Sequence, residues 1–420
     1  MQQLMSISDV AKDLNVSIDT IRRWEKKGLI KARRDEKNYR VFDVNELRRA
    51  HEKYVGGELP QSRYAVLQAD TKTSFTSVEL FAGAGGLALG MENAGINHSL
   101  LVEIDKHAAA TLKSNRQDWN VSCADAREMS YDGITADIVT GGFPCQSFSF
   151  AGKQLGFEDA RGTLFFELAR CIKDLQPKIA VGENVKGLLV HDDGKTLQAM
   201  LSILDDLGYR VAYRVLRAQY FDVPQKRERL VIIAVRKDLD LKILFPKEKD
   251  YTISMREALE NTPTSLGQEY PQRKREIMEL VPAGGYWRDL PIELQKEYMA
   301  GSFHLGGGKT GMARRLAWDE PSLTLTCSPA QKQTERCHPS ETRPLNVREY
   351  ARVQTFPDNW KFEGSTNAQY KQIGNAVPVN LGYHIGRCLV AMLEDKPDYD
   401  TMEEAKIHEP LPPIQSTLFS

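Results

Sequence analysis

The sequence predicts an α/β protein with a doubly wound, mostly parallel sheet, preceded by a helix-turn-helix and joined to a smaller irregular region. Three observations lead to this prediction. From Thr76 onward, short β-rich runs alternate with helical runs, the pattern of parallel strands joined by crossover helices. Two short helical patterns lie within residues 1–54, which hold 13 Lys and Arg against 9 Asp and Glu. Beyond Asp238 the alternation weakens, and Pro, Gly and Arg interrupt any regular pattern.

Composition excludes several other classes of protein. A chain of 420 residues with 41% hydrophobic and 27% charged residues is typical of a globular protein with two or three domains. Apolar runs stay short of the roughly 20 residues of a membrane helix, and MQQLMSISDV lacks the features of a signal peptide, so we expect a cytoplasmic protein. The six cysteines form no C-x-x-C pair, which favours free thiols over a disulfide framework or a zinc ribbon. The net charge of -1 gives no overall sign of nucleic-acid binding, although a mean can hide a local basic patch.

The N-terminal segment predicts a helix-turn-helix. Ser8 and Ser17 are candidate caps of two helices, and the second helix buries Ile21 and Trp24 before it ends at Gly28. Its outward residues would face phosphates or guanine edges, and these are Thr20, Arg22, Arg23 and Lys26. KARRDEKNYRVF then alternates like a small wing, and Asp43 with Glu46 begins another helix. TIRRWEKKGLI and YRVFDVNEL resemble the winged helix-turn-helix of MerR-type regulators, although a small helical oligomerisation module would show similar patterns.

A glycine-containing loop follows the first strand of the alternating region. Phe81 to Leu87, FAGAGGL, leads from a strand into a helix, where small residues let a ligand approach the backbone and the helix N-terminus favours negative charge. Glu103 ends the next strand, from which an acid can hold both ribose hydroxyls, and Asp125 after a third strand could accept from an adenine amino group. These residues predict a site for an adenosine-containing cofactor, and the loop alone would serve NAD equally well.

A cysteine in a polar loop marks a second candidate site. In GGFPCQSFS the glycine pair frees a loop after the fourth strand, so we expect Cys145 to face the same crevice as a nucleophile rather than lie buried as an inert thiol. The strand KIAVGEN delivers Glu183 and Asn184 to the same sheet edge. QKRERL places Arg227 and Arg229 on one face of the following strand, so a nucleophile, an acid and two cations would converge.

FAGAGGL, GGFPCQSFS, GENV, QKRERL and QIGNAVPV, in that order, resemble the motif set of DNA (cytosine-5) methyltransferases. The resemblance covers roughly residues 76–390 and implies a Rossmann-like, S-adenosyl-L-methionine-dependent catalytic domain with a smaller target-recognition domain. It implies that Cys145 attacks cytosine C6, that Glu183 relieves charge at N3, and that Arg227 positions the base near O2. The target base would be flipped out of the duplex. The implied cofactor shell is Phe81, Gly83, Gly85, Leu87, Glu103, Ile104, Asp125, Ala126, Pro144 and Asn375.

The resemblance also divides the chain. We expect a MerR-like domain at 1–55, a linker at 56–75, the catalytic domain at 76–240 and again at 343–395, the target-recognition domain at 241–342, and a flexible tail at 396–420. Residues GMARRLAWDEPSLTLTCSPAQKQTERCHP are interpreted as the DNA-reading loop, with a solvated charged surface as the alternative. The candidate DNA contacts of the methyltransferase are Gln146, Ser147, Arg229, Arg314 and Arg315.

Two weaker patterns are rejected. GGGKTG lacks the earlier glycine of a phosphate-binding P-loop, since Phe303 occupies that position. Cys327, Cys337 and His338 do not have the spacing of a four-ligand zinc site, and we expect no metal.

Partners and competing functions remain open at this point. A modification enzyme of a restriction system would have a cognate endonuclease, and its N-terminal domain could bind an operator. A tRNA cytosine-5 methyltransferase has similar motifs, and a transcription regulator with secondary methylase activity is the third possibility. In the tail, Gln415 to Phe419 resembles the peptide with which bacterial DNA-processing proteins bind the replicative sliding clamp, and a merely disordered tail is the alternative.

Overall fold

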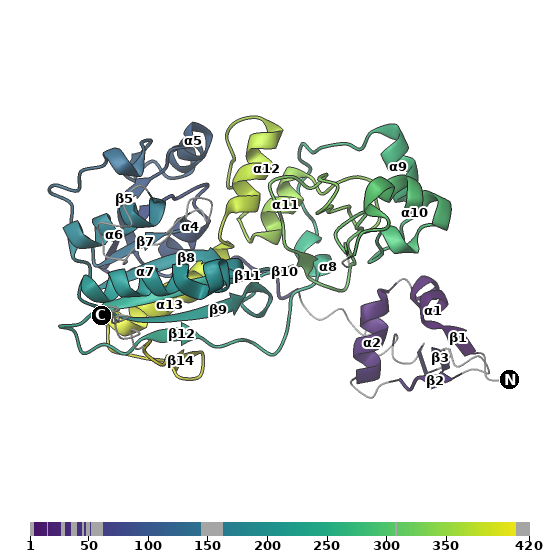
Figure 1. The fold of residues 1–420 in the computed structure, drawn as a ribbon, viewed down its shortest axis with the longest axis horizontal. Helices are drawn as coiled ribbons and strands as arrows, with labels where there is room; N and C mark the ends of the chain where they lie inside the picture. The colour runs from purple at the N-terminus through teal and green to yellow at the C-terminus, as the bar shows by residue number, and fades with distance from the viewer. Residues whose placement is uncertain are drawn as a thin grey trace, which may run out of the picture.

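The computed structural model describes residues 4–14, 16–26, 30–34, 40–43, 46–47, 51, 62–143, 163–306 and 309–408. Figure 1 shows an α/β body on one side, a lobe that carries α8 to α12 beside it, and the N-terminal elements below that lobe. The predicted loop with Cys145, the residues 307–308 and the end of the tail lie outside the described residues.

The body is built on a seven-stranded sheet of order β6-β5-β4-β7-β8-β11-β9. Neighbouring strands run parallel from β6 to β8, whereas β11 runs antiparallel to both β8 and β9. The predicted doubly wound, mostly parallel sheet is therefore confirmed. The strands are β4 (Thr76–Leu80), β5 (Asn97–Val102), β6 (Val121–Ser122), β7 (Ile138–Gly141), β8 (Ile179–Val185), β9 (Tyr209–Arg217) and β11 (Glu228–Arg236).

Helices cover both faces of this sheet because its strands are apolar on both sides. Along β11, Leu230 and Ile232 belong to the core beneath α6 and α7, while Val231 and Ile233 belong to the core beneath α4 and α13. Thr163 caps α6 by accepting from Phe166 N at 3.2 Å. The helices of the body are α4 (Gly86–Asn93), α5 (Lys106–Asn115), α6 (Leu164–Leu175), α7 (Lys195–Asp206) and α13 (Val379–Leu393).

One helical stretch, Thr366–Glu394, is long and apolar enough to cross a membrane by length and composition alone. It contains α12 and α13, and 78% of its most apolar window is buried inside the protein, as in a core helix.

The neighbouring lobe has an apolar core of its own, made from residues between Tyr270 and Cys337. This core begins later than the predicted boundary at 241, because β12 (Leu244–Pro246) lies in the core of the body. The elements of the lobe and of the return to the body are α8 (Met255–Leu259), α9 (Gln272–Glu279), α10 (Ile292–Met299), β13 (Ser322–Leu323), α11 (Val347–Val353) and α12 (Thr366–Asn375). The 3-10 helices are η1 (Ala126–Glu128), η4 (Lys186–Leu189), η5 (His191–Gly194), η6 (Ala218–Tyr220), η7 (Trp287–Asp289) and η8 (Ala300–Ser302).

The first part of the predicted tail is fixed to the body, which corrects the expectation of a free segment from 396. Strand β14 (Met402–Glu404) pairs antiparallel with β12, and His408 N donates to Val211 O at 2.7 Å. Backbone pairing holds this polar segment, and Met402, which is 6% exposed, adds an apolar contact with the core of the body. Residues 409–420, with the clamp-like peptide, lie outside the described residues.

The predicted linker is also corrected over its described part. Residues 62–75 run along the body, where Leu67 N donates to Asn380 Oδ1 at 2.9 Å and Asn380 Nδ2 donates to Ala65 O at 2.8 Å. Tyr64 OH donates to Arg352 O at 3.0 Å. The Asn380 side chain of α13 and a backbone carbonyl of α11 therefore hold a segment that has few apolar anchors of its own.

The N-terminal elements form the predicted helix-turn-helix with a small sheet. They are β1 (Leu4–Ser6), α1 (Ile7–Asp13), α2 (Ile18–Lys26), β2 (Arg33–Arg34) and β3 (Arg40–Asp43), with sheet order β1-β3-β2. Ile21, Trp24 and Phe42 lie in a separate apolar core. Ser17 caps α2 as predicted, since Thr20 N donates to its Oγ at 3.0 Å, but Ser6 rather than Ser8 caps α1 by accepting from Asp9 N at 3.2 Å.

Candidate active site

The glycine loop between β4 and α4 turns through left-handed backbone. Phe81, Gly83 and Gly85 have φ angles of 59°, 55° and 83°. A Cβ on Gly83 would meet nothing within 4 Å, so this glycine faces open space where a ligand can approach. A Cβ on Gly85 would lie 2.6 Å from Leu112 Cδ2, and Gly85 N already donates to Ala82 O at 3.0 Å. Gly85 is therefore required by its left-handed backbone and by packing, and its contact with the cofactor stays a prediction.

Leu87 lies in the first turn of α4 and is only 4% exposed. Its side chain packs in the same core as Val377 and Leu381. The Leu87 side chain therefore belongs to the core beneath the sheet, and the predicted contact of this residue with the cofactor stays a prediction that its backbone would have to fulfil.

Glu103 is anchored against the glycine loop. Its two carboxylate oxygens accept from Gly83 N and Asp105 N, each at 2.7 Å. Burial raises the pKa of this carboxyl, and the two backbone N–H groups oppose that shift. Because each oxygen has a further lone pair, Glu103 can still accept from two ligand hydroxyls beside Gly83.

Three other residues of the predicted cofactor shell differ in how free their side chains or carbonyls are to contact a ligand. Ile104 is 65% exposed, so its apolar side chain can pack on the face of a flat ring. Asp125 pairs with Arg127 at 2.6 Å, which lowers the pKa of the carboxyl and occupies part of its accepting capacity. Ala126 is buried and its carbonyl accepts from Arg170 Nη2 at 2.7 Å. An open glycine, an acid with free lone pairs and an exposed apolar side chain fit an adenosine group.

The end of β8 holds the entrance to the loop that carries Cys145. Asn184 Nδ2 donates to Phe143 O at 2.8 Å, and a Cβ on Gly142 would lie 3.1 Å from Glu183 Oε2. Glu183 is 9% exposed. The carboxylate of Glu183 therefore lies against the backbone just before GGFPCQSFS, while Pro144, Cys145, Gln146 and Ser147 lie outside the described residues.

The two arginines of QKRERL have different surroundings. Arg229 Nε lies 2.7 Å from Glu183 Oε1, an ion-pair distance without hydrogen-bond alignment. Arg227 is 2% exposed, and its terminal nitrogens donate to Leu325 O and Gly374 O at 3.1 Å each. Burial lowers the pKa of Arg227 to about 9, and the neighbouring Arg229 acts in the same direction. Arg229 is thus the cation beside Glu183, whereas Arg227 is held by two backbone carbonyls, and its contact with the base stays a prediction.

Two glutamines connect the strand of these arginines to the last motif, and the sequence analysis did not find this link. Gln225, in β10 (Gln225–Lys226), is fully buried and donates to Gln354 Oε1 at 2.8 Å. Gln354 Nε2 donates to Ile373 O at 2.7 Å and to Ala376 O at 3.1 Å, on either side of Asn375. Asn375 is exposed, and its Oδ1 lies 3.1 Å from Cys327 Sγ. Gln225 is a polar residue of the QKRERL motif, and this was the sequence feature from which the link could have been found.

Some of the predicted DNA-contacting side chains are exposed and others are buried. Arg315 is 4% exposed and donates to the carbonyls of Val281, His338, Glu341 and Met278, so it is a structural residue of the lobe. Arg314 is half-buried, and burial lowers its pKa. Thr20 is 3% exposed, which contradicts its outward placement, whereas Arg22 and Arg23 are exposed as predicted. The side chain of Lys26 lies outside the described residues.

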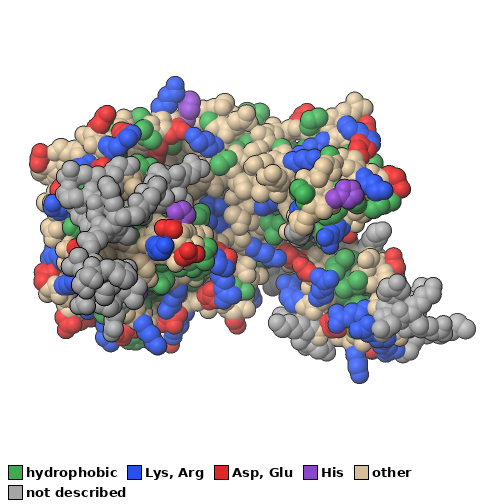
Figure 2. Space-filling view, in the orientation of Figure 1, with side chains coloured by type: hydrophobic (Ala, Val, Ile, Leu, Met, Phe, Trp, Pro, Cys, Tyr) green, Lys and Arg blue, Asp and Glu red, His purple; other side chains and the backbone are tan. Residues whose placement is uncertain are grey.

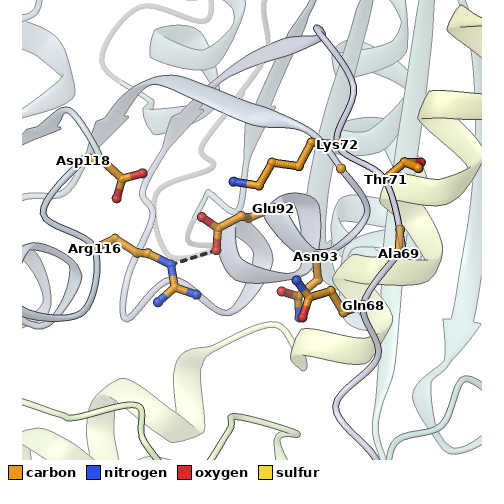
Figure 3. A pocket seen from close by; sticks show the side chains of 9 residues that line it. Gln68, Ala69, Thr71, Lys72, Glu92, Asn93, Arg116 and Asp118 are labelled. Atoms are coloured by element: carbon orange, nitrogen blue, oxygen red, sulfur yellow. Dashed lines mark hydrogen bonds and ion pairs between the residues drawn. The ribbon is translucent and has the colours of Figure 1, made fainter.

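A polar hollow of about 330 Å³ lies elsewhere on the body, at the C-terminal end of α4 (Figure 3). Figure 3 shows Glu92 directed toward Arg116, with which it pairs at 2.8 Å, and Lys72 and Asp118 at the rim. Its lining includes none of the residues around Glu103 or Glu183. Within the described part of the chain, no group of three or more His, Cys, Asp or Glu is arranged to hold a metal ion.

Comparisons with known proteins identify the class. Residues 75–391 match the family model C-5 cytosine-specific DNA methylase, and residues 6–42 match MerR family regulatory protein. The Type II methyltransferase M.Eco47II of Escherichia coli is 53% identical over 407 residues, which is 94% of this chain and 97% of that relative. The Type II methyltransferase M.PspPI of Psychrobacter sp. (strain TA137) is 57% identical over 343 residues, 79% of this chain and 82% of that one.

A solved structure agrees with this fold. A DNA modification methyltransferase encoded within an E. coli prophage has a TM-score of 0.57 at 23% identity, over 76% of this chain and 100% of that chain. This chain belongs to the C-5 cytosine-specific DNA methylase family. It is a DNA (cytosine-5) methyltransferase that carries a MerR-like helix-turn-helix at its N-terminus.

Proposed function

We propose that this enzyme methylates C5 of a flipped cytosine in a specific duplex site through a covalent bond between Cys145 Sγ and cytosine C6. The observation that supports this most directly is the position of Glu183 against Gly142, three residues before Cys145. Because three residues span at most about 11 Å, the thiol and the Glu183 carboxylate are within reach of one base. The ion pair with Arg229 gives the site a cation as well as an acid.

S-adenosyl-L-methionine supplies the methyl group, and Glu103, Gly83 and Ile104 would hold its adenosine part. The Cys145 thiolate adds to C6, and the C5=C6 electron pair becomes available at C5 for the methyl group. Glu183 shares a proton with N3 as negative charge develops on the ring, and Arg229 stabilises charge at O2. A base then removes the C5 proton, the double bond returns, and the S–C6 bond breaks to release the enzyme.

The test of this proposal uses Cys145→Ala with Cys123→Ala as the matched control, since Cys123 is an exposed thiol of the same body. Methyl transfer should vanish in Cys145→Ala, while duplex binding remains within about threefold of the unchanged protein, because the phosphate contacts survive. Cys123→Ala should keep its activity. Measurable turnover by purified Cys145→Ala would refute the covalent mechanism.

We further propose a role in a restriction-modification system, in the bacterial cytoplasm where its duplex substrate lies. The type II methyltransferase relatives support this role, and it implies a cognate endonuclease that reads the same site. Methylation mapping by bisulfite or nanopore sequencing of DNA from an expressing host would give the site. DNA with no methylated cytosine above background would exclude the proposal.

The N-terminal domain is proposed to bind a second, operator-type DNA sequence. Its match to the MerR family and the exposed Arg22 and Arg23 support this function. Binding through these arginines should weaken steeply as salt rises, because each phosphate contact releases counterions. An Arg22→Ala, Arg23→Ala variant should lose operator binding and keep methylation of the target site.

A further inference from the structure

The N-terminal domain contacts the target-recognition lobe through the cap of α2. Ser17 Oγ donates to Glu320 Oε1 at 2.7 Å, and both side chains are buried, at 5% and 7% exposure. The same Ser17 hydroxyl accepts from Thr20 N. One residue therefore caps the second helix of the helix-turn-helix and binds the methyltransferase.

Glu320 is held on its other side by the body. Its Oε2 lies 2.9 Å from Lys226 Nζ on β10, and β10 pairs in parallel with β13, which begins two residues after Glu320. Burial raises the pKa of this carboxyl, but Lys226 and Ser17 outweigh burial and hold it below its usual value. The carboxylate is thus a fixed acceptor rather than a mobile surface group.

Close packing and complementary charge extend the contact. A Cβ on Gly284 would lie 3.1 Å from Ser17 Cβ, so the backbone of the lobe approaches the cap closely. Burial raises the pKa of Asp319, and the positive charge of Arg23 opposes this rise. Burial lowers the pKa of Arg314, and the negative charge of Asp19 opposes this fall. Figure 2 shows charged side chains of both signs where the N-terminal lobe meets the rest of the molecule.

The covered end of α2 is the end that a helix-turn-helix inserts into the major groove. Ser17 and Thr20 lie at this end and are at most 5% exposed, whereas Arg22 and Arg23 further along the helix are exposed. Thr20, which is 3% exposed beside the Ser17–Glu320 contact, is not accessible to a duplex in this arrangement. A contact made of charges and hydroxyls is also of the kind that opens, since polar interdomain interfaces are weaker than apolar ones.

We propose that the target-recognition lobe masks the DNA-reading end of α2, so that the chain binds operator-type DNA through this helix only after Ser17 separates from Glu320. This inference rests on the proposed DNA binding of the N-terminal domain. Operator-type DNA would then compete with the target-recognition lobe for the same end of α2. Binding of operator-type DNA and binding of the methylation site would therefore be coupled.

The variant that tests it is Glu320→Gln in the full chain, which keeps the shape of the side chain and removes its charge. Glu276→Gln is the matched control, because Glu276 is an exposed carboxylate of the same lobe that pairs with Arg273. Hydrogen exchange of the peptide covering residues 16–24 measures the docking. We expect exchange about tenfold faster in Glu320→Gln, as for loss of a charge-assisted hydrogen bond, and no change in Glu276→Gln. Equal exchange in all three proteins would overturn the masking.

Selection from a randomised 40-base-pair duplex library measures DNA reading. Besides the methylation site, Glu320→Gln should enrich a second motif at least tenfold more strongly than the unchanged protein does. Adding Arg22→Ala and Arg23→Ala to Glu320→Gln should abolish the enrichment of this second motif. If the unchanged protein enriches that motif equally, the masking is refuted while operator binding stands. If faster exchange is seen but neither protein enriches a second motif, operator binding itself is refuted, and masking falls with it.

Discussion

Arg229 Nε lies 2.7 Å from Glu183 Oε1, while Arg227, two residues earlier, donates to the carbonyls of Leu325 and Gly374. Arg229 lies in β11, whereas Arg227 lies between β10 and β11, and the two side chains have different partners. Arg229 pairs with Glu183 at the end of β8, and Arg227 joins the chain before β11 to Leu325 and to the end of α12.

This difference in partners predicts opposite effects of two matched substitutions. Arg229→Lys keeps a charge beside Glu183 but loses the planar guanidinium, so kcat should fall more than tenfold with little change in thermal unfolding. Arg227→Lys cannot reach both carbonyls, so it should destabilise the fold by about 1–3 kcal/mol, with a smaller effect on kcat. Single-turnover methylation and calorimetry would measure both. A loss of kcat confined to Arg227→Lys would support the predicted base contact of Arg227.

Glu103 should act on the cofactor alone. Glu103→Gln replaces one charged acceptor beside Gly83 by an amide, so the KM for S-adenosyl-L-methionine should rise about 10- to 100-fold while the Kd for duplex DNA is unchanged. Glu92→Gln is a suitable control, because Glu92 lies at the other end of α4 in the polar hollow. Calorimetric titration gives the cofactor affinity directly. An unchanged affinity in Glu103→Gln would remove this residue from the cofactor site.

The mostly parallel sheet followed from the sequence, because the alternation of strand-like and helical runs is a local pattern. Strand-like apolar runs, such as the one before Glu103, can be found without tertiary knowledge. The sequence does not show which of two possible partners a side chain contacts in the folded protein. Arg227 and Arg229 were expected to share a strand face, but Arg227 lies between β10 and β11, where it donates to the carbonyls of Leu325 and Gly374.

Segments without apolar anchors were also misjudged, for a related reason. Residues 62–75 and 396–408 were expected to be free, but Asn380 and β12 bind them through hydrogen bonds that no local pattern encodes. Thr20 was placed outward by helical periodicity, and Glu320, some 300 positions later in the chain, covers the end of that helix.

The C-terminal peptide carries a separate prediction. A synthetic peptide of residues 409–420 should bind purified bacterial sliding clamp, because Gln415 can anchor it while Leu418 and Phe419 fill an apolar pocket. A peptide with Leu418→Ala and Phe419→Ala should not bind. Fluorescence anisotropy with both peptides decides the matter, and equal binding, or none by either, would end the idea. Such a contact would bring the enzyme to newly replicated DNA.

Glu79 gives the enzyme a pH-dependent stability that the sequence did not indicate. This residue lies on β4, is 2% exposed, and accepts from Thr140 Oγ1 at 3.3 Å. Burial raises its pKa to about 8, and the charges of Glu103 and Glu183 act in the same direction. Because the folded state then holds a proton that the unfolded state loses near pH 4.5, this contribution is complete below pH 4.5 and is lost as the pH rises to about 8.

Glu79→Gln carries no titrating proton, so the difference in unfolding free energy between the unchanged protein and this variant isolates the effect from every other titrating group. That difference should shift in favour of the variant by about 1.4 kcal/mol for each pH unit across the interval. Urea unfolding at pH 5, 6, 7 and 8 measures it. A difference that stays constant over these four pH values would mean that Glu79 has the same proton affinity in the folded and the unfolded chain.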